Sequence, residues 1–144
     1  MKPSSLEVVW KAHTDAEFVT KDLEATMATM VDDPYVNHVP TNAGARGQKA
    51  LRAFYRDVFI PSWPPDVKTE LINRVVGADQ LVDELRMTFT HSKRMEWFLP
   101  NVPPTNKKLT VDFVAIISFR GDKIATERIY WDQASVLRQI GLLK

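Results

Sequence analysis

The stretch Ala125-Thr126-Glu127-Arg128-Ile129-Tyr130-Trp131-Asp132-Gln133 decides the fold of this chain. Its β-branched and aromatic residues are typical of a strand, and Asp132 is a residue type that begins helices. Glu127 lies in phase with Ile129 and Trp131, so one face of the strand combines a carboxylate with apolar groups. Because a charge within a strand needs water, a partner or a shifted pKa, this face is a candidate site.

Further β-structure precedes this strand in the chain. Three β-rich stretches lie upstream, and the short turns that contain Gly77 and Gly121 are suited to hairpins. The Pro-rich insertion 99–106 is long enough to act as a rim or lid of a pocket. The strands of the predicted antiparallel meander are 68–76, 80–91, 109–120 and 124–131.

Helical patterns flank this meander. Ser4 and Glu7 form a capping box for a first helix, and Asp22 can cap a second. Helices followed by an antiparallel sheet predict an α+β fold with the helices on one face of the sheet, in a single domain over residues 1–144. The expected helices span about 4–21, 22–30, 51–59 and 132–141, and a short strand spans 35–39.

Composition argues against several classes of partner. Lys and Arg number 19 against 18 Asp and Glu, so the net charge of +1 gives no field that favours nucleic acid or an anionic membrane. The chain has no cysteine, which removes disulfides and thiolate chemistry. Residues 1–5 lack the apolar core of a secretory signal, and no run approaches the roughly 18 apolar residues of a spanning helix. We therefore expect a cytoplasmic protein without nucleic acid or membrane partners.

The strand 109–120 is apolar on both faces. Leu109 and Phe113 point one way, whereas Val114 and Ile116 point the other. Helices on one side of the sheet would leave the second set exposed. We therefore predict that the outer face packs on a second copy in a two-fold homodimer.

Several local motifs carry a resemblance to a known superfamily. They are Gly121-Asp122-Lys123-Ile124, Tyr130-Trp131-Asp132, the helix end Leu137-Arg138-Gln139-Ile140-Gly141, and the loop Pro104-Thr105-Asn106-Lys107. Together with the order of elements, they resemble the SnoaL-like polyketide cyclases of the nuclear-transport-factor-2-like superfamily. The resemblance implies a conical half-barrel, in which a curved antiparallel sheet carries the N-terminal helices on its concave face around an apolar pocket. It also implies a wide range of functions, from cyclisation, isomerisation, dehydration and epoxide hydrolysis to ligand binding.

Few catalytic residues of that superfamily carry over. Tyr35-Val36-Asn37 resembles the Tyr-x-Asn motif that orients the attacking water in limonene epoxide hydrolase. The acid/base aspartate of the polyketide cyclases and one aspartate of the epoxide hydrolase both fall on Ile129. The hydrolase's Arg-x-Asp pair falls near Leu85 and Met87. Neither established mechanism can therefore be copied onto this chain.

The histidines are candidates for acid/base chemistry, because their ordinary pKa lies near neutrality. His38 follows Tyr35 and Asn37 on the short strand, and alternation places it on the face opposite both. Either that pair or His38 enters the pocket, and His38 can instead bond to loop backbone. His91 ends a strand at the mouth of the cavity or on the surface, and His13 is expected on a helix face.

Each of three carboxylates also has two possible roles. Glu127 can replace the missing aspartate in the pocket, or it can form a salt bridge with Arg86 or Arg128. Asp132 is a helix cap or a pocket residue. Asp83 reaches the pocket edge or faces solvent.

Aromatic side chains, Trp63 among them, are suited to a flat or apolar ligand. Trp97 and Phe98, beside the Pro-rich insertion, are expected to serve as a lid or a dimer contact. The sequence shows no metal-ligand spacing and no phosphate-binding Gly-rich loop, so we expect neither a metal nor a cofactor. The predicted substrate-binding residues are Trp97, Phe98, Trp131, Tyr55, Phe113 and Asp132.

These features support a small-molecule enzyme that uses acid/base chemistry on an apolar carbonyl or polyketide-like substrate, giving cyclisation, isomerisation or dehydration. His38 and Glu127 would share the proton transfers, with Tyr35, Asn37 and His91 orienting substrate or water. One alternative is a non-catalytic ligand-binding or dimerisation module. Another is a hydrolase that uses water held by Tyr35 and Asn37.

Overall fold

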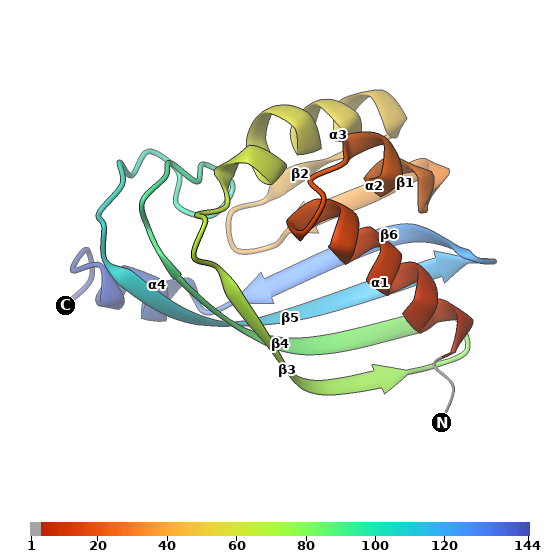
Figure 1. Ribbon diagram of the computed structural model, residues 1–144. Helices are drawn as coiled ribbons and strands as arrows, with labels where there is room; N and C mark the ends of the chain where they lie inside the picture. Colours follow the sequence, from red (N-terminus) through yellow and green to blue (C-terminus); the bar gives the residue numbers. More distant parts are fainter. Residues whose placement is uncertain (1–3) are drawn as a thin grey trace.

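A curved six-stranded sheet forms the frame of the protein in the computed structural model, which describes residues 4–144 (Figure 1). The strand order is β2-β1-β6-β5-β4-β3, and neighbouring strands are antiparallel except for β1 and β6. The predicted meander and the α+β class with an open sheet are confirmed. The strands span Met30–His38 (β1), Ala43–Arg46 (β2), Lys68–Val76 (β3), Gln80–Thr90 (β4), Lys108–Arg120 (β5) and Lys123–Trp131 (β6).

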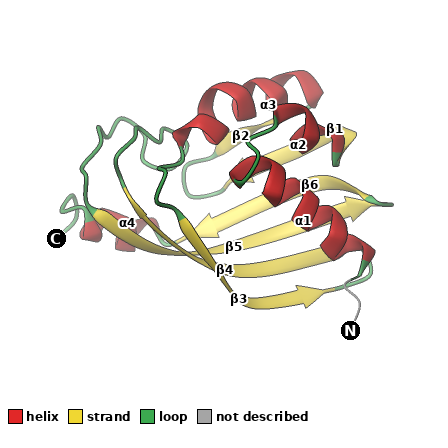
Figure 2. Ribbon diagram, viewed as in Figure 1, coloured by secondary structure: helices red, strands yellow, loops and turns green. Residues whose placement is uncertain are grey.

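Helices cover the concave face of the sheet and the edge formed by β1 and β2 (Figures 1 and 2). The predicted capping box begins α1, because Ser4 Oγ accepts from the Glu7 amide and Glu7 Oε1 accepts from the Ser4 amide. Asp22 and Asp132 cap α2 and α4 by accepting from the Ala25 and Ser135 amides, respectively. No helix within residues 4–144 has the length and apolar composition needed to cross a membrane. The bounds are Ser5–Phe18 (α1), Leu23–Ala28 (α2), Gln48–Phe54 (α3), Tyr55–Phe59 (η1, a π-helix), Ile60–Ser62 (η2, a 3₁₀-helix) and Gln133–Gln139 (α4).

Alternation along the strands separates an inner from an outer face. Every second residue of β5 from Leu109 to Phe119 is buried against the helices. Val114 and Ile116, on the outer face, are half-buried in the single chain. The packing of this outer face on a second copy stays a prediction.

The edge strands β1 and β2 differ from the sequence expectation. β1 begins at Met30 rather than Tyr35, because a bulge after Met30 lets Asp32-Asp33-Pro34 run through the strand outside the regular ladder. The segment around Gly44, which lies outside the strands expected from the sequence, is strand β2 and pairs with β1. A Cβ at Gly44 would lie 1.9 Å from the carbonyl oxygen of Val36, so this close pairing requires glycine.

The insertion between β4 and β5 packs inward. Trp97, Phe98 and Leu99 are each at most 2% exposed. The carbonyl of Trp97 accepts a hydrogen bond from the Thr41 hydroxyl at 2.5 Å, and that of Phe98 accepts from the Gln133 amide at 2.9 Å. Their burial is incompatible with the predicted dimer contact, because these side chains complete the hydrophobic core. Trp97 also lines the cavity described below, so a role as its cover stays a prediction.

Candidate functional site

A cavity of about 310 Å³ lies between α1 and the concave face of the sheet. This volume suits a small organic ligand rather than a large one. Its walls are mainly apolar, and polar side chains from α1, β1, β4 and β6 interrupt them. The aromatic part of the lining consists of Trp10, Phe18, Phe59, Trp63, Trp97 and Phe113.

One row of paired residues forms the floor of this cavity. Asp83, Ala115, Ile129 and His38 are paired in turn across β4, β5, β6 and β1, so their side chains share one face of the sheet. The small side chain of Ala115 leaves space in the middle of the row. Ile129, on which the family's aspartate falls, is an apolar part of the lining.

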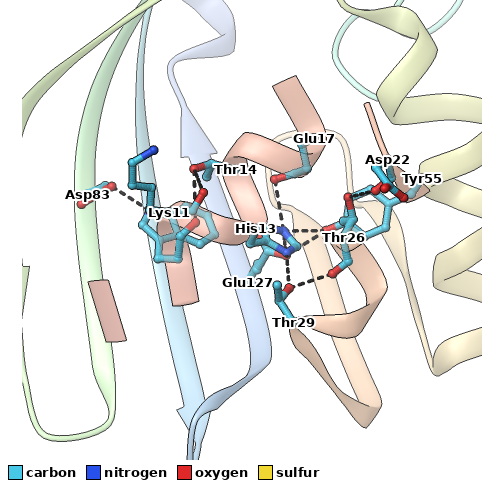
Figure 3. Close-up of polar contacts among 11 residues, drawn as sticks. Lys11, His13, Thr14, Glu17, Asp22, Thr26, Thr29, Tyr55, Asp83 and Glu127 are labelled. Carbon is cyan, nitrogen blue, oxygen red and sulfur yellow. Dashed lines mark hydrogen bonds and ion pairs between the residues drawn. The ribbon is translucent and has the colours of Figure 1, made fainter. Parts of the chain in front are cut away.

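A buried cluster of charged side chains closes one side of the cavity. His13 and Glu17 lie one turn apart on α1, and Glu127 faces them from β6 (Figure 3). His13 Nε2 is 3.1 Å from Glu17 Oε1 and 3.1 Å from Glu127 Oε2. Tyr55 donates its hydroxyl to Glu127 Oε2 at 2.8 Å. All four side chains are buried.

The hydrogen bonds of His13 identify it as a cation. The Thr29 hydroxyl donates to the carbonyl of Thr26 at 2.7 Å, so its oxygen accepts the proton of His13 Nδ1, 2.8 Å away. Nε2 faces two carboxyl oxygens and therefore carries a proton as well. Burial alone would lower the pKa of His13, but the charges of Glu127 and Glu17 raise it well above its ordinary value.

The pKa values of the two carboxyl groups beside His13 are shifted in opposite directions. Burial raises the pKa of Glu17, and its bond to His13 only partly compensates. Burial also acts on Glu127, but the charge and hydrogen bond of His13, together with the Tyr55 hydroxyl, lower its pKa below the ordinary value. Glu127 therefore keeps its negative charge more readily, whereas Glu17 holds a proton more readily.

Each of these carboxyl groups retains an oxygen for a ligand. Glu17 Oε2 and Glu127 Oε1 receive no hydrogen bond from any residue among 4–144, while the other oxygen of each group faces His13. Both residues line the cavity. The cluster can therefore exchange protons with a bound molecule.

Asp83, on β4, is fully engaged by other side chains. Arg74 donates to both of its oxygens, at 2.7 and 2.9 Å, and Trp10 Nε1 donates to Oδ2 at 2.8 Å. Arg74 also reaches Glu7 at 3.3 Å. These bonds tie α1 to β3 and β4 and fix the helix above the cavity.

His38 contributes a neutral imidazole to the lining. Its Nδ1 donates to the carbonyl of Ala43 at 2.9 Å, because a carbonyl can only accept. Burial lowers the pKa of His38 to about 4, so the ring carries one proton near pH 7 and Nε2 is an acceptor. No donor among the described residues reaches that nitrogen.

The structure brings five of the sequence-predicted site residues to the cavity or its wall. Glu127, His38, Trp97 and Phe113 line it directly. Tyr55 lies behind Glu127 and acts on the cavity through its hydroxyl.

Three of the other predicted residues lie elsewhere. Tyr35 packs beneath the guanidinium of Arg46, 4.5 Å from its ring centre, and Asn37 lies on the same side of β1. Neither belongs to the cavity lining. His91 is buried outside the cavity, where its Nδ1 lies 3.0 Å from the Thr105 hydroxyl.

The remaining three predicted residues have structural contacts. Phe98 and Trp131 stack in the core with ring centres 5.2 Å apart. Asp132 accepts from the Ser135 amide at 3.1 Å and caps α4.

Sequence reasoning missed His13 and Glu17 as site residues. His13 was expected on an ordinary helix face, and an arginine was the alternative partner for Glu127, whereas the partner is His13. The signal was present in the spacing. Leu6, Trp10, His13 and Glu17 follow one another at i, i+4, i+7 and i+11, so both titratable residues continue the apolar stripe of α1.

The same cluster is the group of described residues that could hold a metal ion. The ligand atoms of His13, Glu17 and Glu127 lie within 4.8 Å of one another. In the present arrangement, Nε2 of His13 lies 3.1 Å from an oxygen of each carboxyl group, where its positive charge compensates the charge of Glu127.

A family model confirms what the fold and the cavity indicate. The model of the SnoaL-like polyketide cyclases matches residues 12–140. The chain belongs to the SnoaL-like polyketide cyclase family. The match includes the cluster on α1 and β6 as well as the whole sheet. Comparison with curated proteins finds no significant match to this SnoaL-like chain.

Solved structures share the fold at low sequence identity. TsrD from Streptomyces laurentii superposes with a TM-score of 0.72 at 20% identity, with 99% of each chain covered. An NTF2-like protein from Burkholderia pseudomallei K96243 gives 0.71 at 18% identity, covering 96% of this chain and 98% of its own. A protein with a ketosteroid isomerase-like fold from Catenulispora acidiphila, in complex with trimethylamine, gives 0.67 at 16% identity, covering 93% and 92%. These similarities show the fold of the SnoaL-like chain.

Proposed function

We propose that this protein is an acid/base enzyme that moves a proton on a small, largely apolar carbonyl compound, as a cyclase or isomerase. The observation that carries the proposal is the pair of carboxyl groups, Glu17 and Glu127, whose pKa values are displaced in opposite directions on one wall of the cavity. Such a pair divides naturally into an acid and a base.

Glu127 is the base in this mechanism. Its free oxygen Oε1 removes a proton from the carbon next to the substrate carbonyl, while Oε2 stays bonded to Tyr55 and His13. The imidazolium of His13 stabilises the carboxylate before the transfer and lies close to the negative charge that moves onto the substrate. Glu17 supplies the proton that neutralises this charge on oxygen or on a second carbon. The apolar walls keep water away from the intermediate.

His38 has a different role from the proton transfer first expected of it. A histidine with a pKa of about 4 is a weak base near neutral pH. We propose that His38 binds substrate through Nε2, and that Glu17 takes the place of His38 as the partner of Glu127.

Exchange of carbon-bound protons tests the proposal without knowledge of the natural substrate. The wild-type protein should speed the incorporation of deuterium beside the carbonyl of a bicyclic ketone such as 2-tetralone, followed by proton NMR in D₂O. Glu127→Gln should slow the enzymatic exchange by roughly 100-fold to 10,000-fold, which is the usual contribution of a general base. Glu84→Gln is the matched control, because Glu84 lies within β4 outside the cavity lining and should retain the wild-type rate.

The pH dependence of the exchange rate distinguishes the roles of the two carboxyl groups. Exchange requires Glu127 to be charged, so the acid limb should lie below the ordinary glutamate value of 4.5. It also requires protonated Glu17, whose pKa is raised, so the rate should fall as pH rises through that higher value. Glu17→Gln should slow the exchange and abolish its alkaline limb. An exchange rate equal to that of buffer, in a protein that binds the ketone, would instead support a non-catalytic binding module, which the apolar lining also fits.

A further inference from the structure

Three side-chain nitrogens are buried without a hydrogen-bond partner among residues 4–144: His38 Nε2, Trp63 Nε1 and His91 Nε2. Buried polar atoms in folded proteins are nearly always paired, so each such atom needs an explanation. His38 and Trp63 both belong to the cavity lining, whereas His91 does not. A ligand in the cavity can therefore explain the unpaired nitrogens of His38 and Trp63, but not that of His91.

The other indoles of the chain show how unusual Trp63 is. Trp10 donates to Asp83, Trp97 donates to Ser62 at 2.8 Å, and Trp131 donates to Gln133 at 2.7 Å. The chain thus supplies an acceptor to each indole except that of Trp63. The exception occurs on the wall of the cavity, where a bound molecule can supply the acceptor.

The two unpaired nitrogens belong to one aromatic wall. The ring of Trp97 has its centre 4.7 Å from that of His38 and 5.3 Å from that of Trp63. Phe59 joins them in the same way, at 5.3 and 5.9 Å. His38 and Trp63 therefore pack against the same two rings at the cavity wall.

The chemistry of each nitrogen is fixed. The Nδ1–H group of His38 is committed to the Ala43 carbonyl, so Nε2 can only accept. An indole N–H can only donate. A complementary ligand needs one donor and one acceptor. Neither nitrogen carries a charge near pH 7, so an uncharged ligand matches the pair.

We propose that His38 and Trp63 form a polar recognition pair for a flat, uncharged hydroxy ketone, whose hydroxyl donates to His38 and whose carbonyl accepts from Trp63. The presence of a carbonyl group in the ligand rests on the proposed function, and the His38–Trp63 pair specifies the class of substrate for that chemistry. A site that hydrogen-bonds a hydroxyl discriminates strongly against analogues that lack it, because its buried group is then left unpaired. His38 accordingly selects for the hydroxyl, and Trp63 selects for the ketone.

Binding of matched fragments tests the pair independently of turnover. The probes are the positional isomers of hydroxy-1-tetralone, the corresponding methoxy compounds, and 1-tetralone, titrated into the labelled protein and followed by NMR. For at least one isomer, the hydroxy compound should bind at least tenfold more tightly than its methoxy counterpart and than 1-tetralone. It should shift both the Nε2 resonance of His38 and the Nε1 proton of Trp63. The compounds without a hydroxyl should shift only the Trp63 proton.

Variants assign the two preferences to the two residues. His38→Phe should lose the tenfold preference for the hydroxyl, and Trp63→Phe should weaken the binding of every ketone. Phe89→Leu is the control, because Phe89 packs 5.4 Å from Trp63 outside the lining, and its loss should leave the preference unchanged. Glu127→Gln should also retain the preference, so failure of the catalytic proposal would not affect this result.

Equal affinities of the hydroxy, methoxy and unsubstituted ketones for the wild-type protein would overturn the proposal. So would the absence of any shift at His38 and Trp63 up to the solubility limit of the hydroxytetralones. Both results come from the wild-type protein alone and stand even if a variant fails to fold.

Discussion

Glu17 and Glu127 can both pair with the imidazolium of His13. We therefore predict that the losses of unfolding free energy caused by replacing them are strongly non-additive. Glu17→Gln leaves Glu127 3.1 Å from His13 Nε2 and still bonded to Tyr55. Because the raised pKa of Glu17 favours its protonated form, the neutral amide is a close substitute, and we expect a loss of under about 1 kcal/mol of unfolding free energy. Glu127→Gln removes a stronger bond, but Glu17 remains 3.1 Å from the ring, so we expect a loss of about 1–2 kcal/mol.

The double variant leaves His13 without an anion. The ring then gives up its second proton at pH 7, and the stabilisation of the buried ion pair, about 3–5 kcal/mol, is lost. The double substitution should therefore cost about 4 kcal/mol or more, which exceeds the sum of the single effects by about 1–3 kcal/mol. Urea denaturation of the four proteins at pH 7, with the slope m checked for constancy, measures this coupling energy.

The same set of proteins should show opposite pH dependences. In the wild type, the pKa of His13 is higher in the folded than in the unfolded state, so its contribution is complete below the ordinary value of 6.5 and is lost as pH rises through the folded value. Glu17, whose pKa is also raised, acts in the same direction. In the double variant, burial without a partner lowers the pKa of His13, so stability should fall as pH drops below 6.5.

Two results would refute this account of the cluster. One is additivity of the single effects within about 0.5 kcal/mol, which is the limit for independent sites. The other is a double variant whose stability changes with pH in the same sense as the wild type. Glu84→Gln, outside the cavity lining, controls for the general effect of removing a carboxylate from this small protein.

Three further perturbations test other parts of the structure. Asp83→Asn should cost about 3 kcal/mol in urea denaturation, because it disrupts the bidentate bond from Arg74 in a buried position; a loss below 1 kcal/mol would contradict this anchor. Gly44→Ala should cost more than about 3 kcal/mol in thermal unfolding, because its Cβ would meet backbone at 1.9 Å, whereas Gly47→Ala, which meets nothing within 4 Å, should cost about 1 kcal/mol. Ala115→Leu should fill the floor of the cavity and weaken tetralone binding at least tenfold in NMR titration, and unchanged affinity would place the ligand elsewhere.

Most of the fold could be predicted because its signals are local. Capping residues such as Ser4, Asp22 and Asp132 begin helices through bonds to amides a few residues away, and each does so in the structure. The meander followed from alternation and short turns. Strand β2 was missed because its pairing depends on the close approach of Gly44 to the backbone of β1, which no local pattern records.

The site could be predicted only in part, because its chemistry depends on contacts between distant segments. Glu127 stood out as a charge within a strand, whereas alternation separated His38 from Tyr35 and Asn37 without deciding which of them faces the cavity. The partner of Glu127 comes from α1, more than a hundred residues away in the chain. A helical histidine is an ordinary surface residue until tertiary packing buries it, so the sequence alone favoured the wrong partner.

The apolar residue at position 129 and the charged cluster are physically connected. Side chains two positions apart on a strand share one face and lie about 6.6 Å apart along it. A carboxylate at 127 rather than 129 therefore still faces the cavity, but it lies beneath α1, where its burial would oppose its charge. The imidazolium of His13 on the overlying helix turn favours its charged form, and the Tyr55 hydroxyl adds a second donor. In the proposed mechanism, Glu127 can act as a base because α1 carries His13. The two residues should therefore be exchanged together in any attempt to transfer the site to a relative with the same fold.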